Sequence, residues 1–167
     1  MAGLFAFGGR MQGTMKTIAA MLIIVVTTGA AHVCAQEADP GRIEFSPTKG
    51  MQALLTAKGQ EVELNLAGEG KQATEIITVE TEKRLRLKIE DYNFDGFRDF
   101  SISHADDGMG TYEVSLVYVY SPNEKKFVPL APRCGDEFIN LVVNKSRKTL
   151  TNSYVVDNKY RTCQAKY

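Results

Sequence analysis

The sequence predicts an all-β protein: one small domain of antiparallel strands, arranged as a sandwich, a flattened barrel or a propeller-like unit. Two observations predict this class. Apolar and polar residues alternate at every second position in short runs, which is the pattern of half-buried strands. Gly, Pro, Asn or Asp separate these runs, as they do in turns between strands. No long stretch has the apolar spacing of an amphipathic helix.

The N-terminal segment has the composition of a secretory signal peptide. Lys16 supplies the charged start, an apolar run spans residues 18–26, and small residues precede Gln36. We therefore assign residues 1–35 to a signal peptide, with Met15 as the expected start. A membrane helix is the alternative, but the apolar run is shorter than the roughly 20 residues that span a bilayer. Export of this kind predicts a periplasmic protein.

Cysteine usage fits an oxidising compartment. Cleavage after Ala35 removes Cys34 and leaves Cys134 and Cys163, which predicts one disulfide. Closing a loop of about 30 residues stabilises a fold by roughly 3.6 kcal/mol in the chain-entropy model. Lipidation at Cys34 is the alternative. It is disfavoured because Val33 is bulkier than the small residue that normally precedes a lipidated cysteine.

The expected mature chain is long enough for one hydrophobic core. It carries 18 basic and 20 acidic residues, so it has no nucleic-acid footprint. Residues 36–60 form an N-terminal segment in which EADPGR resembles a linker and MQALLTAKG is compatible with a strand or a short helix. Residues 61–167 form the predicted β domain.

Within that domain the strongest strand pattern is TYEVSLVYVY, which is apolar on both sides at its far end and therefore predicts a central strand. The turn 121–126 then predicts a hairpin with KFVPLA. Three further strands follow, and the basic turn 145–148 between two of them is predicted to be solvated. The inward-facing residues of the earlier runs are Val62, Leu64 and Leu66; Leu85, Leu87 and Ile89; and Phe100 and Ile102, which alternate with the polar Asp99, Ser101 and Ser103.

Two of these strands flank an acidic loop, DYNFDGFRD, at residues 91–99. Oxygen-bearing side chains occupy its first, third, fifth and ninth positions, and Gly96 at the sixth allows a sharp turn. Such spacing suits a hard cation, and carboxylates this close repel one another without one. The predicted calcium ligands are the side chains of Asp91, Asn93, Asp95 and Asp99 and the main-chain carbonyl of Phe97.

The loop is not an EF-hand, because its twelfth position is Ile102 where a bidentate glutamate is required. Five protein oxygens fall short of the six to eight that calcium takes, so water is expected to complete the shell. We expect a dissociation constant of roughly 10⁻⁴ to 10⁻³ M, as in extracellular calcium modules. Asp106 or Asp107 could add a ligand. The alternative is a metal-free Asx turn between two strands.

The sequence offers few residues that could form a catalytic site. The expected mature chain has one histidine, His104, so a multi-histidine metal site is excluded and a serine nucleophile has only one candidate base. His104 continues the face of Phe100 and Ile102, which predicts a partly buried histidine satisfied by a neighbour. We therefore expect a protein without enzymatic activity.

Residues 84–128 resemble the family of periplasmic immunity and lysozyme-inhibitor-like proteins that carry a single FG-GAP-like calcium loop. Members combine an acidic loop, a glycine-rich loop and a tyrosine-rich strand that ends in a turn before an aromatic residue. The corresponding segments here are residues 91–99, 108–112 and 118–127. The resemblance implies a β-rich domain that inserts a loop into the cleft of a peptidoglycan-degrading, lysozyme-like effector and so protects the producing cell.

The resemblance also points to the loop that contacts the target. Inhibitors of invertebrate-type lysozyme use a Ser-Gly-x-Tyr loop, and here the corresponding segment is Met-Gly-Thr-Tyr, with methionine in place of serine. The two aspartates before it are hypothesised to engage charged groups of the target cleft. The predicted target-binding residues are Asp106, Asp107, Gly108, Met109, Gly110, Thr111 and Tyr112.

A calcium-stabilised adhesion module of FG-GAP type, without inhibitory activity, is the alternative function. Adhesion propellers need several repeats of the calcium loop to close. This sequence has one such loop, which favours the inhibitor.

Overall fold

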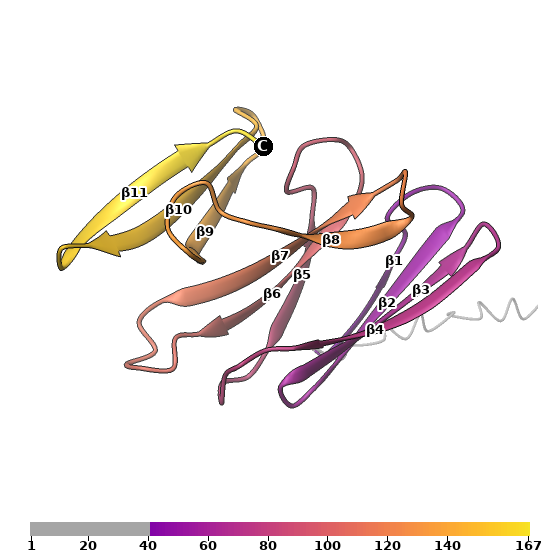
Figure 1. Cartoon of the computed structure of the whole chain (residues 1–167), viewed down its shortest axis with the longest axis horizontal. Coiled ribbons are helices and arrows are strands. Elements are labelled where there is room, and N and C mark those ends of the chain that lie inside the picture. Colours follow the sequence, from indigo (N-terminus) through magenta and orange to yellow (C-terminus); the bar gives the residue numbers. More distant parts are fainter. Residues whose placement is uncertain (1–40) are drawn as a thin grey trace, which may run out of the picture. The chain divides into compact units, whose positions relative to one another are not determined.

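Figure 1 shows the computed structural model, which describes residues 41–167. The expected signal peptide, Cys34 and residues 36–40 lie outside the described residues. The described part is built from strands in two antiparallel sheets, so the all-β class predicted from the sequence is confirmed. In residues 41–167 no helix is long and apolar enough to cross a membrane.

The first sheet has four strands in the order β1-β2-β3-β4. Its strands follow one another along the chain as antiparallel neighbours. The MQALLTAKG segment, for which the sequence left strand and helix open, forms β2 and pairs with β3 along its whole length. The bounds of the strands are β1 Arg42–Phe45, β2 Met51–Lys58, β3 Glu61–Gly68 and β4 Lys71–Thr78.

The second sheet has seven strands in the order β11-β10-β9-β7-β6-β5, with β8 paired to β7. As predicted, TYEVSLVYVY forms the central strand: β7 pairs with β6 on one side and with both β9 and β8 on the other. The predicted hairpin of β7 and β8 is also confirmed. The bounds are β5 Arg86–Glu90, β6 Asp99–Ala105, β7 Glu113–Ser121, β8 Lys126–Leu130, β9 Phe138–Asn144, β10 Thr149–Val156 and β11 Lys159–Ala165.

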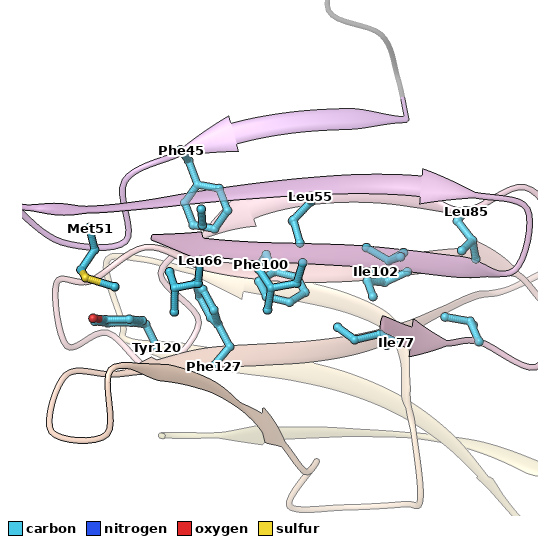
Figure 2. Packing of buried hydrophobic residues seen from close by; sticks show 14 residues of the cluster. Phe45, Met51, Leu55, Leu66, Ile77, Leu85, Phe100, Ile102, Tyr120 and Phe127 are labelled. Carbon is cyan, nitrogen blue, oxygen red and sulfur yellow. The ribbon is translucent and has the colours of Figure 1, made fainter. Parts of the chain in front are cut away.

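The main hydrophobic core lies between the facing sides of the two sheets (Figure 2). Leu55 of β2 and Phe100 and Ile102 of β6 are completely buried there. Burial of one large aliphatic or aromatic side chain stabilises a fold by about 1.5–3 kcal/mol. The residues predicted to face inward from β3 are confirmed as members of this core, namely Val62, Leu64 and Leu66.

A second, smaller core covers the opposite face of the seven-stranded sheet. It contains Tyr92, Val117, Phe138 and Leu150. Because of this second core, the expectation that β6 is a half-buried strand is wrong: all its residues from Asp99 to His104 are buried.

The polar residues of β6 are buried with partners, which is why the sequence pattern was misleading. The hydroxyl of Ser101 lies 2.7 Å from the Tyr92 hydroxyl. Nδ1 of His104 lies 2.7 Å from the carbonyl oxygen of Ala105, which confirms the predicted neighbour, and the side chain is more buried than the partial burial predicted. Hydrogen bonding removes most of the cost of burying such groups.

The predicted disulfide between Cys134 and Cys163 is confirmed, with Cα atoms 6.2 Å apart. It fastens the segment between β8 and β9 to β11. Asn152 of β10 holds the same segment, because its side-chain amide donates to the carbonyls of Cys134 and Glu137 at 2.7 and 3.0 Å.

Candidate functional site

The two loops singled out in the sequence lie at the two ends of β6. The acidic loop, residues 91–99, leads into this buried strand, and the loop of residues 106–112, hereafter the Met109 loop, leaves it toward β7. One rigid strand therefore positions both candidate sites.

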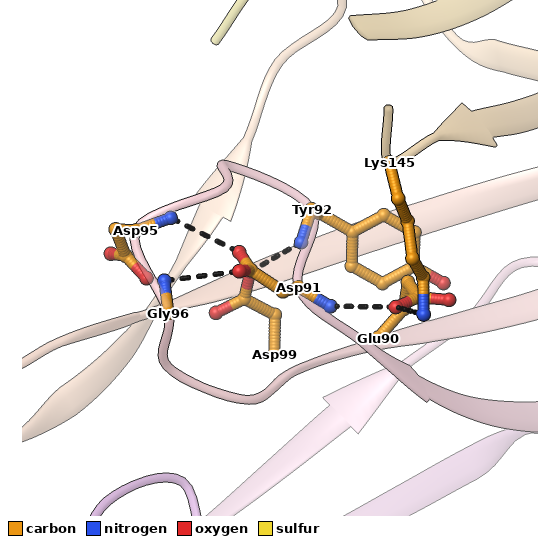
Figure 3. Close-up of polar contacts among 7 residues, drawn as sticks. All are labelled: Glu90, Asp91, Tyr92, Asp95, Gly96, Asp99 and Lys145. Atoms are coloured by element: carbon orange, nitrogen blue, oxygen red, sulfur yellow. Dashed lines mark hydrogen bonds and ion pairs between the residues drawn. The ribbon is translucent and has the colours of Figure 1, made fainter. Parts of the chain in front are cut away.

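In the acidic loop, side-chain oxygens accept hydrogen bonds from the loop's own backbone (Figure 3). The carboxylate of Asp91 accepts from the amides of Asp95 and Gly96 at 3.2 and 3.0 Å. Asn93 Oδ1 accepts from the same Asp95 amide at 3.2 Å, and Asp95 Oδ1 accepts from the Phe97 amide at 2.9 Å. These bonds fold the backbone into the nested Asx turns that the spacing predicts.

This arrangement brings candidate ligand atoms together. Because one amide hydrogen serves both Asp91 Oδ1 and Asn93 Oδ1, these two oxygens lie close to each other. Each carboxylate oxygen has two lone pairs, so accepting one amide hydrogen leaves a lone pair for a cation. Gly96 has φ +91°, a conformation that other residues adopt only with strain. The donor set of Asp91, Asn93 and Asp95 therefore fits a hard cation.

Asp99 lies in a different environment from the other three. Its side chain is fully buried, and its two carboxylate oxygens accept from the backbone amides of Tyr92 and Tyr120 at 2.7 and 2.9 Å. It thereby joins the start of the acidic loop to β7. Burial raises the pKa of Asp99 to about 7, although the hydrogen bonds from the Tyr120 and Tyr92 amides act in the opposite direction.

Neighbouring residues fix the loop to the rest of the domain. Tyr92 is buried, and this burial raises the pKa of its hydroxyl to about 12. Glu90 Oε1 accepts from the Asp91 amide at 3.2 Å and forms an ion pair with Lys145 Nζ at 2.8 Å (Figure 3). The basic turn 145–148 is exposed, as predicted, but its first lysine also tethers the β9–β10 hairpin to the acidic loop.

Among the described residues, no three His, Cys, Asp or Glu side chains form a group that could hold a metal ion. The predicted calcium set differs from such a group, because it combines carboxylates with an amide oxygen and a main-chain carbonyl. Calcium binding by Asp91, Asn93, Asp95, Phe97 and Asp99 thus stays a prediction.

The Met109 loop is closed at its base. The Asp106 amide donates to the Tyr112 carbonyl at 3.0 Å, and the Tyr112 amide donates to Asp106 Oδ1 at 2.8 Å. The second bond holds the pKa of Asp106 below its usual range. Asp107 Oδ1 accepts from the Thr81 hydroxyl at 2.7 Å, which likewise lowers the pKa of Asp107, and from the Glu82 amide at 3.2 Å.

Beyond this base the loop is exposed. Gly108, Gly110 and Thr111 are on the surface, and Met109 at the tip is 87 % exposed. An apolar side chain with so little protein around it stabilises the isolated fold very little, because almost none of its surface leaves water.

Tyr160 is a neighbour that the sequence did not reveal. Its ring lies 5.6 Å from the ring of Tyr112, and it is 56 % exposed. Val155, also half exposed, lies opposite it in the β10–β11 register. The contact joins residues 48 positions apart in the chain, so no local pattern could indicate it.

Comparison with models of known protein families, with curated proteins and with solved structures finds no match for this chain. The family resemblance of residues 84–128 thus remains a prediction.

Proposed function

We propose that the protein is a periplasmic inhibitor of a peptidoglycan-degrading, lysozyme-like effector, acts as an immunity protein, and uses the Met109 loop as its target-binding element. The observation that carries this proposal is the contrast within the loop: its base is fixed by hydrogen bonds, while its tip residue Met109 is 87 % exposed.

A loop of this kind suits insertion into a cleft. Because its base is already ordered, binding costs less conformational entropy than it does for a free segment. Methionine adapts its shape to an apolar surface, and tyrosine supplies a large, rigid contact. The proposal therefore places the main contacts on Met109, Tyr112 and the adjoining Tyr160. Asp106 and Asp107 are assigned to positioning the loop, since their carboxylates already accept hydrogen bonds within the domain.

We further propose that the acidic loop binds calcium. Asp91 and Asp95 each carry a charge that a cation would neutralise, and the shared Asp95 amide brings the oxygens of Asp91 and Asn93 together. The ion would rigidify the turn that enters β6. In this proposal calcium supports the fold that presents the Met109 loop and does not contact the target.

Hydrolysis of purified peptidoglycan by representative c-type, g-type and i-type lysozymes tests the inhibitor proposal. We expect the protein, expressed from its full coding sequence, to inhibit at least one class at a nearly stoichiometric ratio. Met109→Ala should raise the concentration for half-inhibition at least tenfold. The matched control is Val142→Ala, which removes an exposed apolar side chain from β9 and should leave inhibition unchanged. Absence of inhibition in all three classes would contradict the proposed target.

The adhesion-module alternative predicts a different result. Such a module would bind a surface partner and leave every lysozyme fully active. Residues 41–167 contain one acidic loop of the calcium type and form two packed sheets, whereas a propeller needs repeated blades. This observation favours the inhibitor.

A further inference from the structure

The two sheets differ in size, and the difference leaves part of the larger one uncovered. Four strands face seven, so the inner face of β7 is completely buried only over part of its length. Ile102 of β6 is fully buried, yet Leu116, its cross-strand partner on β7, is only half-buried, and so is Tyr118.

A groove of about 370 Å³ opens at this place. It arises because β7 changes partners: β9 pairs with Val114 and Ser115, whereas β8 pairs with the stretch from Val117 to Ser121. The strands β8 and β9 diverge, and the segment 131–137 connects them around the opening. The principal lining side chains are Leu116, Tyr118, Leu130, Pro132, Phe138 and the two acids discussed below.

The groove is held open by the fold. The Cys134–Cys163 disulfide fixes the middle of the connecting segment, and Asn152 bonds to the carbonyls of Cys134 and Glu137 on either side. Tyr118 is fixed as well, because one face of its ring stacks on Phe100 at 4.9 Å. A preformed groove of this kind needs little rearrangement to accept a ligand.

The charged residues that line the groove are all acidic. Asp136 and Glu137 are its charged lining residues, both are exposed, and within residues 41–167 neither carboxylate has a hydrogen bond or an ion pair. The nearby cation Arg133 does not neutralise them, since its guanidinium lies 5.2 Å from the centre of the Tyr167 ring. The groove thus combines apolar lining residues with two unpaired carboxylates.

We propose that this groove binds an arginine side chain of a protein partner. The aliphatic stem would lie along Leu116, and the guanidinium would meet the carboxylates of Asp136 and Glu137. Arginine fits better than lysine because its planar head pairs with carboxylates through two parallel hydrogen bonds and stacks on an aromatic ring such as Tyr118. The site is independent of the Met109 loop and of the inhibitor function.

Amide chemical-shift titration of the ¹⁵N-labelled protein, expressed from its full coding sequence, tests the proposal. The probe is the peptide acetyl-Leu-Arg-Leu-amide, and the matched peptides carry citrulline or lysine in place of arginine. We expect saturable shifts of the Leu116, Tyr118 and Phe138 amides with the arginine peptide. Binding of the citrulline peptide should be at least tenfold weaker, and that of the lysine peptide several-fold weaker.

The double variant Asp136→Asn, Glu137→Gln should weaken binding of the arginine peptide at least tenfold. Asp157→Asn in the exposed β10–β11 turn removes one acid elsewhere and should leave binding unchanged. Equal affinity for the arginine and citrulline peptides would overturn the proposal, as would an unaffected double variant or the absence of shifts at 10 mM peptide. None of these results bears on inhibition by the Met109 loop.

Discussion

The two loops at the ends of β6 have similar compositions. One of them buries key side chains, whereas the other exposes its tip. Both contain aspartates, glycine and an aromatic residue. In the acidic loop Asp99 and Tyr92 are buried, and every aspartate accepts backbone amide hydrogens. In the Met109 loop the Asp106 carboxylate accepts from the Tyr112 amide and also interacts with the amides of Gly108, Gly110 and Thr111, yet the tip projects its largest apolar side chain into solvent.

The difference shows that the position of the amide donors decides how an aspartate-rich loop is used. Where the amides of the loop and of β7 surround the carboxylates, the acids shape the backbone and join it to the core. Where the amides around Asp106 belong to the loop itself, the tip is not joined to the core and is available to a partner.

Removal of the buried carboxylate should have the largest effect. Asp99→Ala leaves the amides of Tyr92 and Tyr120 without acceptors in the core, at about 1–3 kcal/mol for each. We expect the free energy of unfolding in urea to fall by about 2–6 kcal/mol. The control Asp106→Ala acts at a partly exposed loop base and should lower it by less than about 1.5 kcal/mol. Similar losses in both variants would show that the loops do not differ in this way.

Asp99 should also make stability depend on pH in calcium-free buffer. Its folded-state pKa of about 7 lies above the ordinary value near 3.9, so the folded state binds the proton more tightly. Its contribution is therefore fully present below pH 4 and is lost as the pH rises through 7, with a slope of up to about 1.4 kcal/mol per pH unit. In Asp99→Asn this slope should disappear from urea unfolding curves between pH 5 and 8.

Calcium should stabilise the domain by a smaller amount. With a dissociation constant of roughly 10⁻⁴ to 10⁻³ M, 10 mM calcium adds about 1.4–2.7 kcal/mol. We expect a rise of several degrees in the unfolding midpoint relative to chelator, and no rise in Asp95→Ala. An equal response of wild type and variant would place the ion elsewhere, and no response in either would leave the acidic loop as a metal-free turn.

The tip of the Met109 loop should matter least for stability. Met109→Ala removes a side chain that is almost fully solvated, so the free energy of unfolding should change by less than about 0.5 kcal/mol. Thermal unfolding at constant pH checks this. A large loss would mean that the tip packs against the domain and is not free for a partner.

Much of the fold followed from the sequence, because alternation and turn residues are local signals. They located the central strand β7, the β7–β8 hairpin, the three C-terminal strands and the disulfide. They failed for β6, where Ser101 and Ser103 look like solvent-facing residues but are buried beneath a second core.

Contacts between residues far apart in the chain could not be predicted from the sequence either. The Tyr112–Tyr160 contact and the Glu90–Lys145 ion pair join residues far apart in the chain. The groove beside Leu116 exists only because β7 exchanges one partner strand for another. Asp99 was singled out by loop spacing, but its attachment to the Tyr120 amide became visible only in the folded chain.

Shortening the Met109 loop separates its role in inhibition from any role in folding. Replacing Gly108–Thr111 with Asn-Gly keeps the Asp106–Tyr112 and Asp107–Thr81 bonds and removes the exposed tip together with its own amides that face Asp106. Inhibition of the susceptible lysozyme is then measured beside thermal unfolding. We predict a midpoint within a few degrees of the wild type and complete loss of inhibition. Inhibition that persists in the folded, shortened protein would contradict the assignment of this loop as the target-binding element.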